Sequence, residues 1–256
     1  MGSCEKEYCA VMENRYGVVC YSVKSLLFLI AGILILTTLP ATGAEKKTAP
    51  EDLPLIPSEY VWFFGNIPEG AWVSHHFVLR NPHPDTVTIN SLVPGCDCTH
   101  VPKTPIIIPP GKSQLLKVLF DTRTYFGETN RDIHLVTDYV PHPEMDLYFG
   151  SFPAGTSSQV AITPPSTAFI PGKDNQTFII RNLTGESMQF QLFVDNDSSI
   201  TISEDRFSLP GKGEKTIIAR PVWGKFPAGP SYSCLVLEAV RTKPFRVTIP
   251  IKINKF

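Results

Sequence analysis

The alternation of apolar and polar residues predicts short β-strands along most of the chain. In "AWVSHHFVLRN", residues 71–81, every second side chain falls on one face, which carries Ala71, Val73, His75, Phe77 and Leu79. "DTVTINSLVP", "SQLLKVLFD", "DIHLVTD" and "MDLYFGSF" are also short and separated by turn residues. The 24 prolines and 17 glycines are spread along the chain, as frequent turns require. We therefore predict an all-β protein.

A pattern about 100 residues long occurs twice. "HFVLRN" at 76–81 is echoed by "TFIIRN" at 177–182, and "IPPGKSQ" at 108–114 by "LPGKGEK" at 209–215. A unit of this length with about seven strands has the size of an immunoglobulin-like sandwich. We predict two tandem immunoglobulin-like β-sandwiches, at residues 59–153 and 160–256, with linkers at 45–58 and 154–159. Pro250 in the last strand, "FRVTIPIKI", predicts that this strand lies at a sheet edge.

The first 44 residues form a leader of a different kind. Leu26 to Leu36 is an uncharged apolar run, and small residues follow as far as Ala44. This pattern is typical of a secretory signal peptide cleaved near Ala44. The alternative is a retained transmembrane anchor helix, because residues 25–44 are about long enough to cross a bilayer. Translation starting at Met12 would shorten the leader. Either reading places the rest of the chain in the periplasm or on the extracytoplasmic side of the membrane.

Charge and motifs exclude several functions. With 23 basic and 24 acidic residues, the chain has no net field that would attract nucleic acid. Gly111, Lys112 and Ser113 match the end of a phosphate-binding loop, but Ile106 occupies the position of its first glycine. A turn explains this segment, so we expect no nucleotide binding. No complete catalytic signature is present, and we expect no enzyme activity.

"GCDCTH", residues 95–100, is the most chemically suggestive segment. In an extended strand, Cys96, Cys98 and His100 would point to one face, where they could bind copper(I) or zinc(II). The two thiols could instead form a strained, easily reduced disulfide with a redox role. The third reading, which we favour, is that both thiols pack or oxidise without function at a strand end next to Pro94-Gly95. Cys234 alternates with apolar neighbours and is expected to be buried and inert.

Two neighbouring histidines are expected to have separate environments. His75 and His76 fall on opposite faces of their strand, so at most one of them can join a given site. His75 lies on the apolar face, where we expect it to be hydrogen bonded rather than to bind a metal.

Several spaced motifs in residues 60–150 resemble the bacterial family called domain of unknown function 1573. These motifs are Phe64-Gly65, Phe77 to Asn81, Cys96-Asp97-Cys98-Thr99, Pro110-Gly111, and Asp121-Thr122 with Gly127. Asp97 departs from the glycine that is usual in the family. The resemblance implies an immunoglobulin-like fold, similar to major sperm protein, cilia-associated and pilus-chaperone domains, in exported and often membrane-tethered proteins. It implies no reaction.

Together these observations predict a non-enzymatic, exported interaction or assembly module of the cell envelope. A sheet edge would bind a strand of an envelope protein partner, and an uncleaved leader would also hold the protein in the membrane. The alternative is a copper- or zinc-handling or thiol-redox protein that uses Cys96, Cys98 and His100. No other cofactor is expected.

Overall fold

The computed structural model describes residues 11–14, 17–20, 53–123, 125, 127–153, 159–195, 198–240 and 245–256. Residues 1–52 and 53–256 form separate units. In the first unit, β1 (Val11–Asn14) and β2 (Gly17–Cys20) pair as an antiparallel hairpin. The predicted signal or anchor, residues 25–44, lies outside the described residues. Within the described part, no helix has the length and apolar character needed to cross a membrane.

Residues 53–256 are built from strands, as predicted; the described part has one 3₁₀ turn, Trp223–Lys225, and no α-helix. The strands up to residue 153 are β3 (Ile56–Pro57), β4 (Val61–Ile67), β5 (Trp72–Arg80), β6 (Val87–Pro94), β7 (Thr99–His100), β8 (Ile106–Ile108), β9 (Ser113–Asp121), β10 (Thr129–Thr137) and β11 (Glu144–Pro153). They are followed by β12 (Val160–Thr163), β13 (Thr167–Phe169), β14 (Gln176–Asn182), β15 (Met188–Val194), β16 (Ile200–Ile202), β17 (Arg206–Leu209), β18 (Glu214–Pro221), β19 (Gly229–Ala239) and β20 (Phe245–Lys255).

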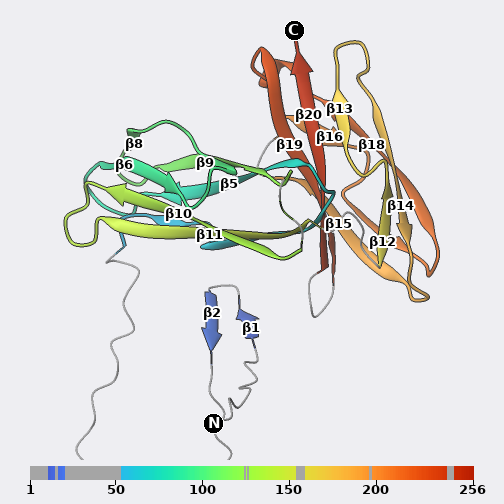
Figure 1. Ribbon diagram of the computed structural model, residues 1–256, viewed down its shortest axis with the longest axis horizontal. Helices are drawn as coiled ribbons and strands as arrows, with labels where there is room; N and C mark the ends of the chain where they lie inside the picture. Colours follow the sequence, from blue (N-terminus) through green and yellow to red (C-terminus); the bar gives the residue numbers. More distant parts are fainter. Residues whose placement is uncertain are drawn as a thin grey trace, which may run out of the picture. The chain divides into compact units, whose positions relative to one another are not determined.

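The strands form two layers around each of two hydrophobic cores (Figure 1). Around the first core, the sheet β3-β5-β9-β7 packs against strands β4-β11-β10-β6-β8. Around the second core, the sheet β12-β14-β18-β16 packs against strands β17-β15-β19-β20. Both arrangements are immunoglobulin-like β-sandwiches, called here the first and second sandwich. Aromatic side chains fill much of their interiors, with Phe64, Phe77 and Phe120 fully buried in the first and Phe169 and Phe178 in the second.

A ten-stranded sheet runs through both sandwiches, because β20 of the second pairs with β4 of the first. Gly65 allows this contact. Its backbone has φ = +71°, and a Cβ atom there would collide with the carbonyl oxygen of Arg246 in β20. Thr248 adds a hydrogen bond of 2.6 Å from its hydroxyl to the Phe64 carbonyl. The glycine of the Phe64-Gly65 motif thus serves the join between the sandwiches.

The predicted edge position of the last strand is wrong. On one side β20 pairs with β19 along its whole length, and on the other it pairs with β4 at Val247 and with β13 from Ile251 to Ile253. Pro250 lies between the stretches that pair with β4 and β13. Its missing amide hydrogen therefore falls at a gap between two partners, and the strand can be internal.

Strand β19 contributes to both cores. Cys234 and Val236 belong to the first core, whereas Leu235 and Leu237 belong to the second. Side chains alternate across a strand, so one strand can supply one face to each sandwich. The continuous apolar run "CLVL" in this strand reflects burial on both faces.

Candidate functional site

Cys96 and Cys98 are joined by a disulfide in the segment between β6 and β7. Their Cα atoms are 5.2 Å apart. The extended geometry expected from the sequence is wrong for this segment: residues 96–99 form a turn, in which the Thr99 amide donates to the Cys96 carbonyl. The turn shortens the distance between the cysteines and brings their sulfur atoms into bonding contact. It is called here the disulfide turn.

Backbone hydrogen bonds hold the disulfide turn at both ends. Before it, the Gly95 amide donates to the Asp132 carbonyl in β10 at 3.0 Å. After it, the Asp121 amide in β9 donates to the Cys98 carbonyl at 2.9 Å. Gly95 also lies directly against the Asp132 carboxylate, where a Cβ atom would not fit. The two cysteines are thus positioned by contacts with both sheets of the first sandwich.

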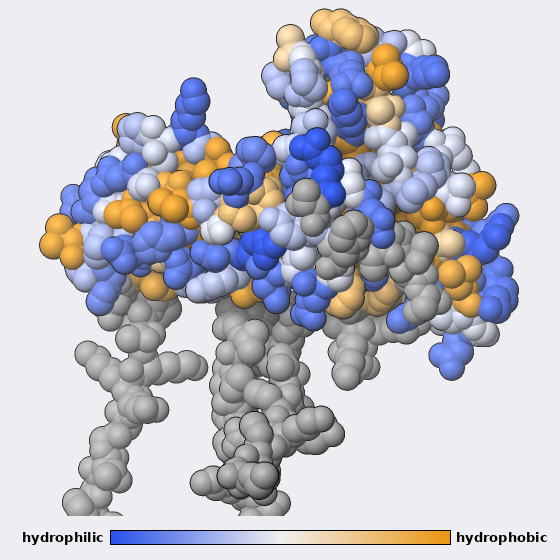
Figure 2. All heavy atoms as spheres, in the orientation of Figure 1, coloured by the Kyte–Doolittle hydropathy of each residue, from blue (hydrophilic) through white to orange (hydrophobic). Residues whose placement is uncertain are grey.

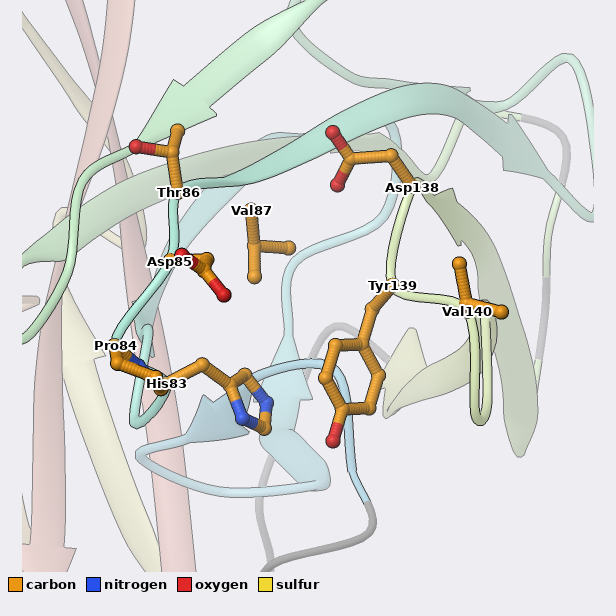
Figure 3. Close-up of a pocket in the computed structure, with 8 residues that line it drawn as sticks. All are labelled: His83, Pro84, Asp85, Thr86, Val87, Asp138, Tyr139 and Val140. Atoms are coloured by element: carbon orange, nitrogen blue, oxygen red, sulfur yellow. The ribbon is translucent and has the colours of Figure 1, made fainter.

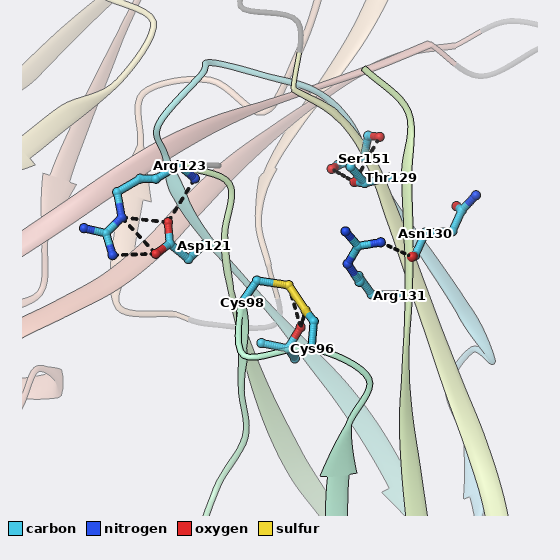
Figure 4. The surroundings of a disulfide bond; sticks show 9 residues. Cys96, Cys98, Asp121, Arg123, Thr129, Asn130, Arg131 and Ser151 are labelled. Carbon is cyan, nitrogen blue, oxygen red and sulfur yellow. Dashed lines mark hydrogen bonds and ion pairs between the residues drawn. A yellow bond between two sulfur atoms is a disulfide. The ribbon is translucent and has the colours of Figure 1, made fainter. Parts of the chain in front are cut away.

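The disulfide (Figure 4) lies within hydrogen-bond distance of the Thr99 hydroxyl. Its oxygen lies 3.3 Å from Cys96 Sγ and 3.8 Å from Cys98 Sγ. Sulfur atoms in a disulfide carry no hydrogen, so the hydroxyl is the donor. Thr99 is buried, whereas both cysteines are partly exposed and Asp97 is exposed. The disulfide is therefore open to solvent on one side and backed by a hydrogen-bond donor on the other.

His100 lies in an aromatic stack instead of converging on the two sulfurs. Its ring stacks on Trp72 at 5.1 Å, and Trp72 also stacks on Tyr232 of β19, at 5.0 Å. The guanidinium of Arg123 lies 5.3 Å from the Trp72 ring centroid. Among the described residues, no group of three or more histidines, cysteines or acids is placed to hold a metal ion. A metal site of Cys96, Cys98 and His100 stays a prediction for the reduced protein.

Asp121, next to the aromatic stack, pairs with Arg123 through contacts of 2.6 to 2.9 Å. Partial burial alone would raise the pKa of the Asp121 carboxyl, but the Arg123 hydrogen bonds and charge outweigh this and lower it. Thr122 closes the same loop by exchanging hydrogen bonds with Ala71 at 2.9 and 3.0 Å. The Asp121-Thr122 motif therefore has a structural role.

A second polar cluster joins the two sandwiches. His75, predicted to be hydrogen bonded, is almost fully buried, with Nδ1 2.6 Å from Asp195 and Nε2 3.0 Å from Glu59. Asp195 follows β15, and its second oxygen accepts a hydrogen bond of 2.8 Å from the His76 amide and lies 3.2 Å from His76 Nδ1. The prediction that only one of the two histidines could join a site is wrong, because one carboxylate from the other sandwich reaches both. Sequence reasoning missed Asp195, which is 120 positions from His75.

The electrostatics of His75 follow from this geometry. Burial alone would lower its pKa, but hydrogen bonds to Asp195 and Glu59, together with their charges, raise it overall. Only the imidazolium form can donate from both ring nitrogens. Trp62 stacks on the imidazole at 3.9 Å, and the Arg246 guanidinium lies 4.2 Å from the Trp62 ring centroid. The cluster of Glu59, His75, His76 and Asp195 therefore links the two sandwiches through buried polar contacts. It is called here the fastening.

A cavity of about 400 Å³ opens on the first sandwich beside His83, Asp85, Asp138 and Tyr139 (Figure 3). Two of the residues that line it, His83 and Tyr139, stack on each other at 4.0 Å, and Asp138 accepts a hydrogen bond from the Thr88 amide at 2.8 Å. None of the residues predicted as a site from the sequence lines this cavity.

Several solved structures are similar to parts of the chain. The periplasmic chaperone SfaE is 17% identical over 38% of this chain and 57% of its own, with a TM-score of 0.34. A protein of unknown function from Porphyromonas gingivalis W83 is 12% identical over 78% of this chain and 99% of its own, with a TM-score of 0.34. An ASH/PapD-like domain of human CEP192 is 12% identical over 39% of this chain and 87% of its own, with a TM-score of 0.33. The match thus spans little more than half of the SfaE chain.

The family comparison concerns the first sandwich. No curated protein matches the chain. The sequence-based resemblance over residues 60–150 is confirmed, because residues 57–150 match the family model described as "Protein of unknown function (DUF1573)".

Proposed function

We propose that this protein is a non-enzymatic, exported or membrane-anchored protein of the cell envelope that binds an extended segment of a protein partner by β-strand addition. The observation that carries the proposal is the incompletely covered outer edge of β9. Strand β7 pairs with β9 only at Leu119 and Phe120. Ser113–Leu116 of β9 has no strand on this side within the described residues.

The outward groups of this edge follow from the alternation of hydrogen-bond directions along a strand. The Asp121 amide points outward, since it donates to Cys98 beside β7. Residues an even number of positions away, including Leu115, therefore present their amides on the same outer side. A partner strand can bond to such groups as a further strand of the sheet would.

Exposed apolar side chains accompany this edge. Leu115 in β9 is 47% exposed, and Ile107 in β8, the terminal strand of the facing sheet, is 62% exposed. Hydrophobic side chains also gather on the part of the visible surface that belongs to the first sandwich (Figure 2). A partner segment with apolar residues at alternate positions fits this surface, because main-chain bonds supply affinity and side-chain contacts supply specificity.

The envelope location in the proposal comes from the sequence. The apolar run Leu26 to Leu36 lies before the folded unit, which begins at Leu53. A short proline-containing segment connects the two in the sequence. A leader of this kind would hold the sandwiches outside the cytoplasm, within reach of envelope proteins. Fractionation of cells that express a C-terminally tagged chain tests the location. N-terminal sequencing of the purified chain tests whether the leader is cleaved near Ala44.

Strand addition is tested with decapeptides selected on the full-length chain from a random library. We expect Leu115→Pro to weaken peptide binding at least about tenfold, because proline removes one outward amide. Leu115→Ala keeps the amide and should have a smaller effect. Hydrogen exchange should show new protection at Ser113–Leu116 in the complex. Equal binding by the wild type and the proline variant, with protection elsewhere, would refute strand addition at β9.

A further inference from the structure

We propose that the Cys96–Cys98 disulfide is a thiol–disulfide exchange site that accepts electrons from a protein dithiol. This activity is separate from strand addition at β9 and rests on different observations. The two sulfurs are bonded to each other, lie partly exposed in a surface turn, and face the Thr99 hydroxyl.

The first step of the argument is that this bond is a poor structural clamp. A disulfide stabilises a fold mainly by constraining the unfolded chain, and the effect grows with the length of the closed loop. Cys96 and Cys98 are only two positions apart. Hydrogen bonds from Gly95 to Asp132 and from Asp121 to Cys98 already hold the turn. The fold therefore gains little from the disulfide, and its reduction should leave the sandwich intact.

The same hydrogen bonds make the reaction reversible. They keep residues 95 and 98 attached to β10 and β9, whether or not the sulfurs are bonded. After reduction, the two thiols stay close enough to re-form the bond. A site that cycles between disulfide and dithiol requires this property.

The position of Thr99 gives the two sulfurs different roles. Its hydroxyl is closer to Cys96 Sγ, at 3.3 Å, than to Cys98 Sγ, at 3.8 Å. A hydrogen bond to the departing sulfur stabilises a thiolate leaving group, and a better leaving group speeds exchange. Attack on Cys98 with Cys96 leaving is thus the favoured direction.

The reaction balances as a two-electron exchange. A thiolate of the partner attacks Cys98 Sγ, forming a mixed disulfide, and the Cys96–Cys98 bond breaks to release the Cys96 thiolate. The second thiolate of the partner then attacks the first partner sulfur, which is bonded to Cys98 in the mixed disulfide. This step closes a disulfide within the partner and releases the Cys98 thiolate. The partner dithiol loses two electrons and becomes a disulfide, while Cys96 and Cys98 gain two electrons and take up the two protons that the partner loses.

A binding surface for the partner lies beside the sulfurs. His100 is exposed and stacks on Trp72, which in turn stacks on Tyr232. These flat rings, with Arg123 over Trp72, form an aromatic platform that begins two residues after Cys98. Aromatic and arginine side chains are common anchors of protein interfaces. The platform would hold a chain segment of the partner while its thiolate reaches Cys98.

The test follows one peptide of the full-length protein in detergent. Tryptic cleavage after Arg80 and Lys103 releases residues 81–103, which contain Cys96 and Cys98 but none of the other cysteines. Differential alkylation and mass spectrometry of this peptide measure its reduction by dithiothreitol and by reduced, unfolded ribonuclease A, used as a protein dithiol. We expect reduction in the folded state, with one disulfide gained by ribonuclease for each one lost here.

Four variants test the assigned roles. Thr99→Val should slow reduction about tenfold, as expected for loss of a hydrogen bond to a thiolate, and Thr99→Ser should restore the rate. With glutathione disulfide added to the reduced proteins, Cys98→Ser should form a mixed disulfide through Cys96 faster than Cys96→Ser forms one through Cys98, because the Thr99 hydrogen bond favours the Cys96 thiolate. Circular dichroism serves as the control for folding.

Three results would overturn the proposal. The first is a bond that is reduced only after the protein unfolds. The second is a Thr99→Val rate equal to that of the wild type. The third is a purified protein whose Cys96 and Cys98 are reduced and bound to copper or zinc, which would favour the metal-binding reading.

Discussion

His75 Nδ1 lies 2.6 Å from Asp195 Oδ1, in a buried contact that fastens the first sandwich to the second. Glu59 lies on the other ring nitrogen at 3.0 Å. Because both ring nitrogens face carboxylates, the protonated form of His75 is favoured. The stability of the join between sandwiches should therefore depend on pH.

The pH dependence has two limbs. The pKa of His75 is raised in the folded state, so its contribution is complete below its unfolded value of about 6.5 and is lost as the pH rises through the folded value. For Asp195, burial alone would raise the pKa, but the hydrogen bonds and charges of His75 and His76 lower it overall. Its contribution is complete above about pH 3.9 and is lost as the pH falls through the folded value. Both contributions are complete between about pH 4 and 6.5.

Urea denaturation at a series of pH values measures this profile. Asp195→Asn should lower the free energy of unfolding near pH 5.5 by about 3 kcal/mol, because it leaves a buried partner without its counter-charge, and should flatten both limbs. Asp146→Asn is the matched control, since Asp146 pairs with His134 at 2.8 Å at the surface. A profile of Asp195→Asn parallel to that of the wild type would contradict the assignment.

Gly65 and Gly70 provide a matched pair for the contact between β4 and β20. Both have positive φ, +71° and +69°, but only Gly65 lies against another strand, and a Cβ at Gly70 would have open space. Gly70→Ala should cost about 1 kcal/mol through backbone strain. Gly65→Ala should cost about 3 kcal/mol, since it adds a collision with the Arg246 backbone. Thermal or urea unfolding measures the difference, and equal losses would show that β20 can move away without cost.

Asn81 and Asn182 occupy equivalent positions in the two sandwiches, 101 residues apart. The Asn81 side-chain amide donates to the carbonyls of Asp85 and Ile108, and that of Asn182 to those of Glu186 and Leu209. Each carboxamide oxygen also accepts from the amide two residues ahead. The asparagine of the repeated "RN" thus links two loops of its sandwich through buried hydrogen bonds. This arrangement is called here the asparagine bracket.

Replacing either bracket asparagine should destabilise the protein strongly. We expect Asn81→Ala to lower the free energy of unfolding by about 3 kcal/mol, since three hydrogen bonds are lost and buried groups are left unpaired. Asn182→Ala should have a similar effect. The exposed Asn90 is the control, and its change to alanine should stay within about 0.5 kcal/mol. A small effect at Asn81 alone would show that the two brackets are not equivalent energetically.

Much of the fold could be predicted because strand alternation and the repeat are local properties of the sequence. The segment around His75 and the "RN" repeat are examples. The join between the sandwiches could not be predicted, because it depends on Asp195 reaching His75 and on β20 reaching β4. Alternation within one strand does not show which other strands pair with it. The partners of the last strand were therefore not predictable, and Pro250 alone suggested an edge position.

The candidate site was predicted in part. The sequence singled out Cys96 and Cys98, and the structure places them together. The sequence did not reveal the turn. The turn depends on hydrogen bonds from the Asp121 amide to Cys98 and from the Gly95 amide to Asp132, and both aspartates lie far from the turn in the sequence. The extended geometry that would have brought His100 to the sulfurs was therefore wrong.

Cys234 supplies the last prediction and an internal contrast to Cys96 and Cys98. It is fully buried between the sandwiches and donates a hydrogen bond of 3.1 Å to the Ser74 carbonyl. Burial raises the pKa of its thiol far above the usual range. Thiolate is the reactive form, so N-ethylmaleimide should label Cys234 only when the sandwiches separate or unfold.

The labelling of Cys234 is read from the tryptic peptide 226–241, which contains no other cysteine. In reduced, folded protein, Cys96 and Cys98 in peptide 81–103 should be alkylated at least about a hundredfold faster than Cys234, because Cys96 and Cys98 are partly exposed and Cys234 is buried. Asp195→Asn should speed the labelling of Cys234 but leave that of Cys96 and Cys98 unchanged, since the fastening it weakens lies beside Cys234. Fast labelling of Cys234 in the wild type would mean that the sandwiches separate readily in solution, and the fastening by His75 would then contribute little.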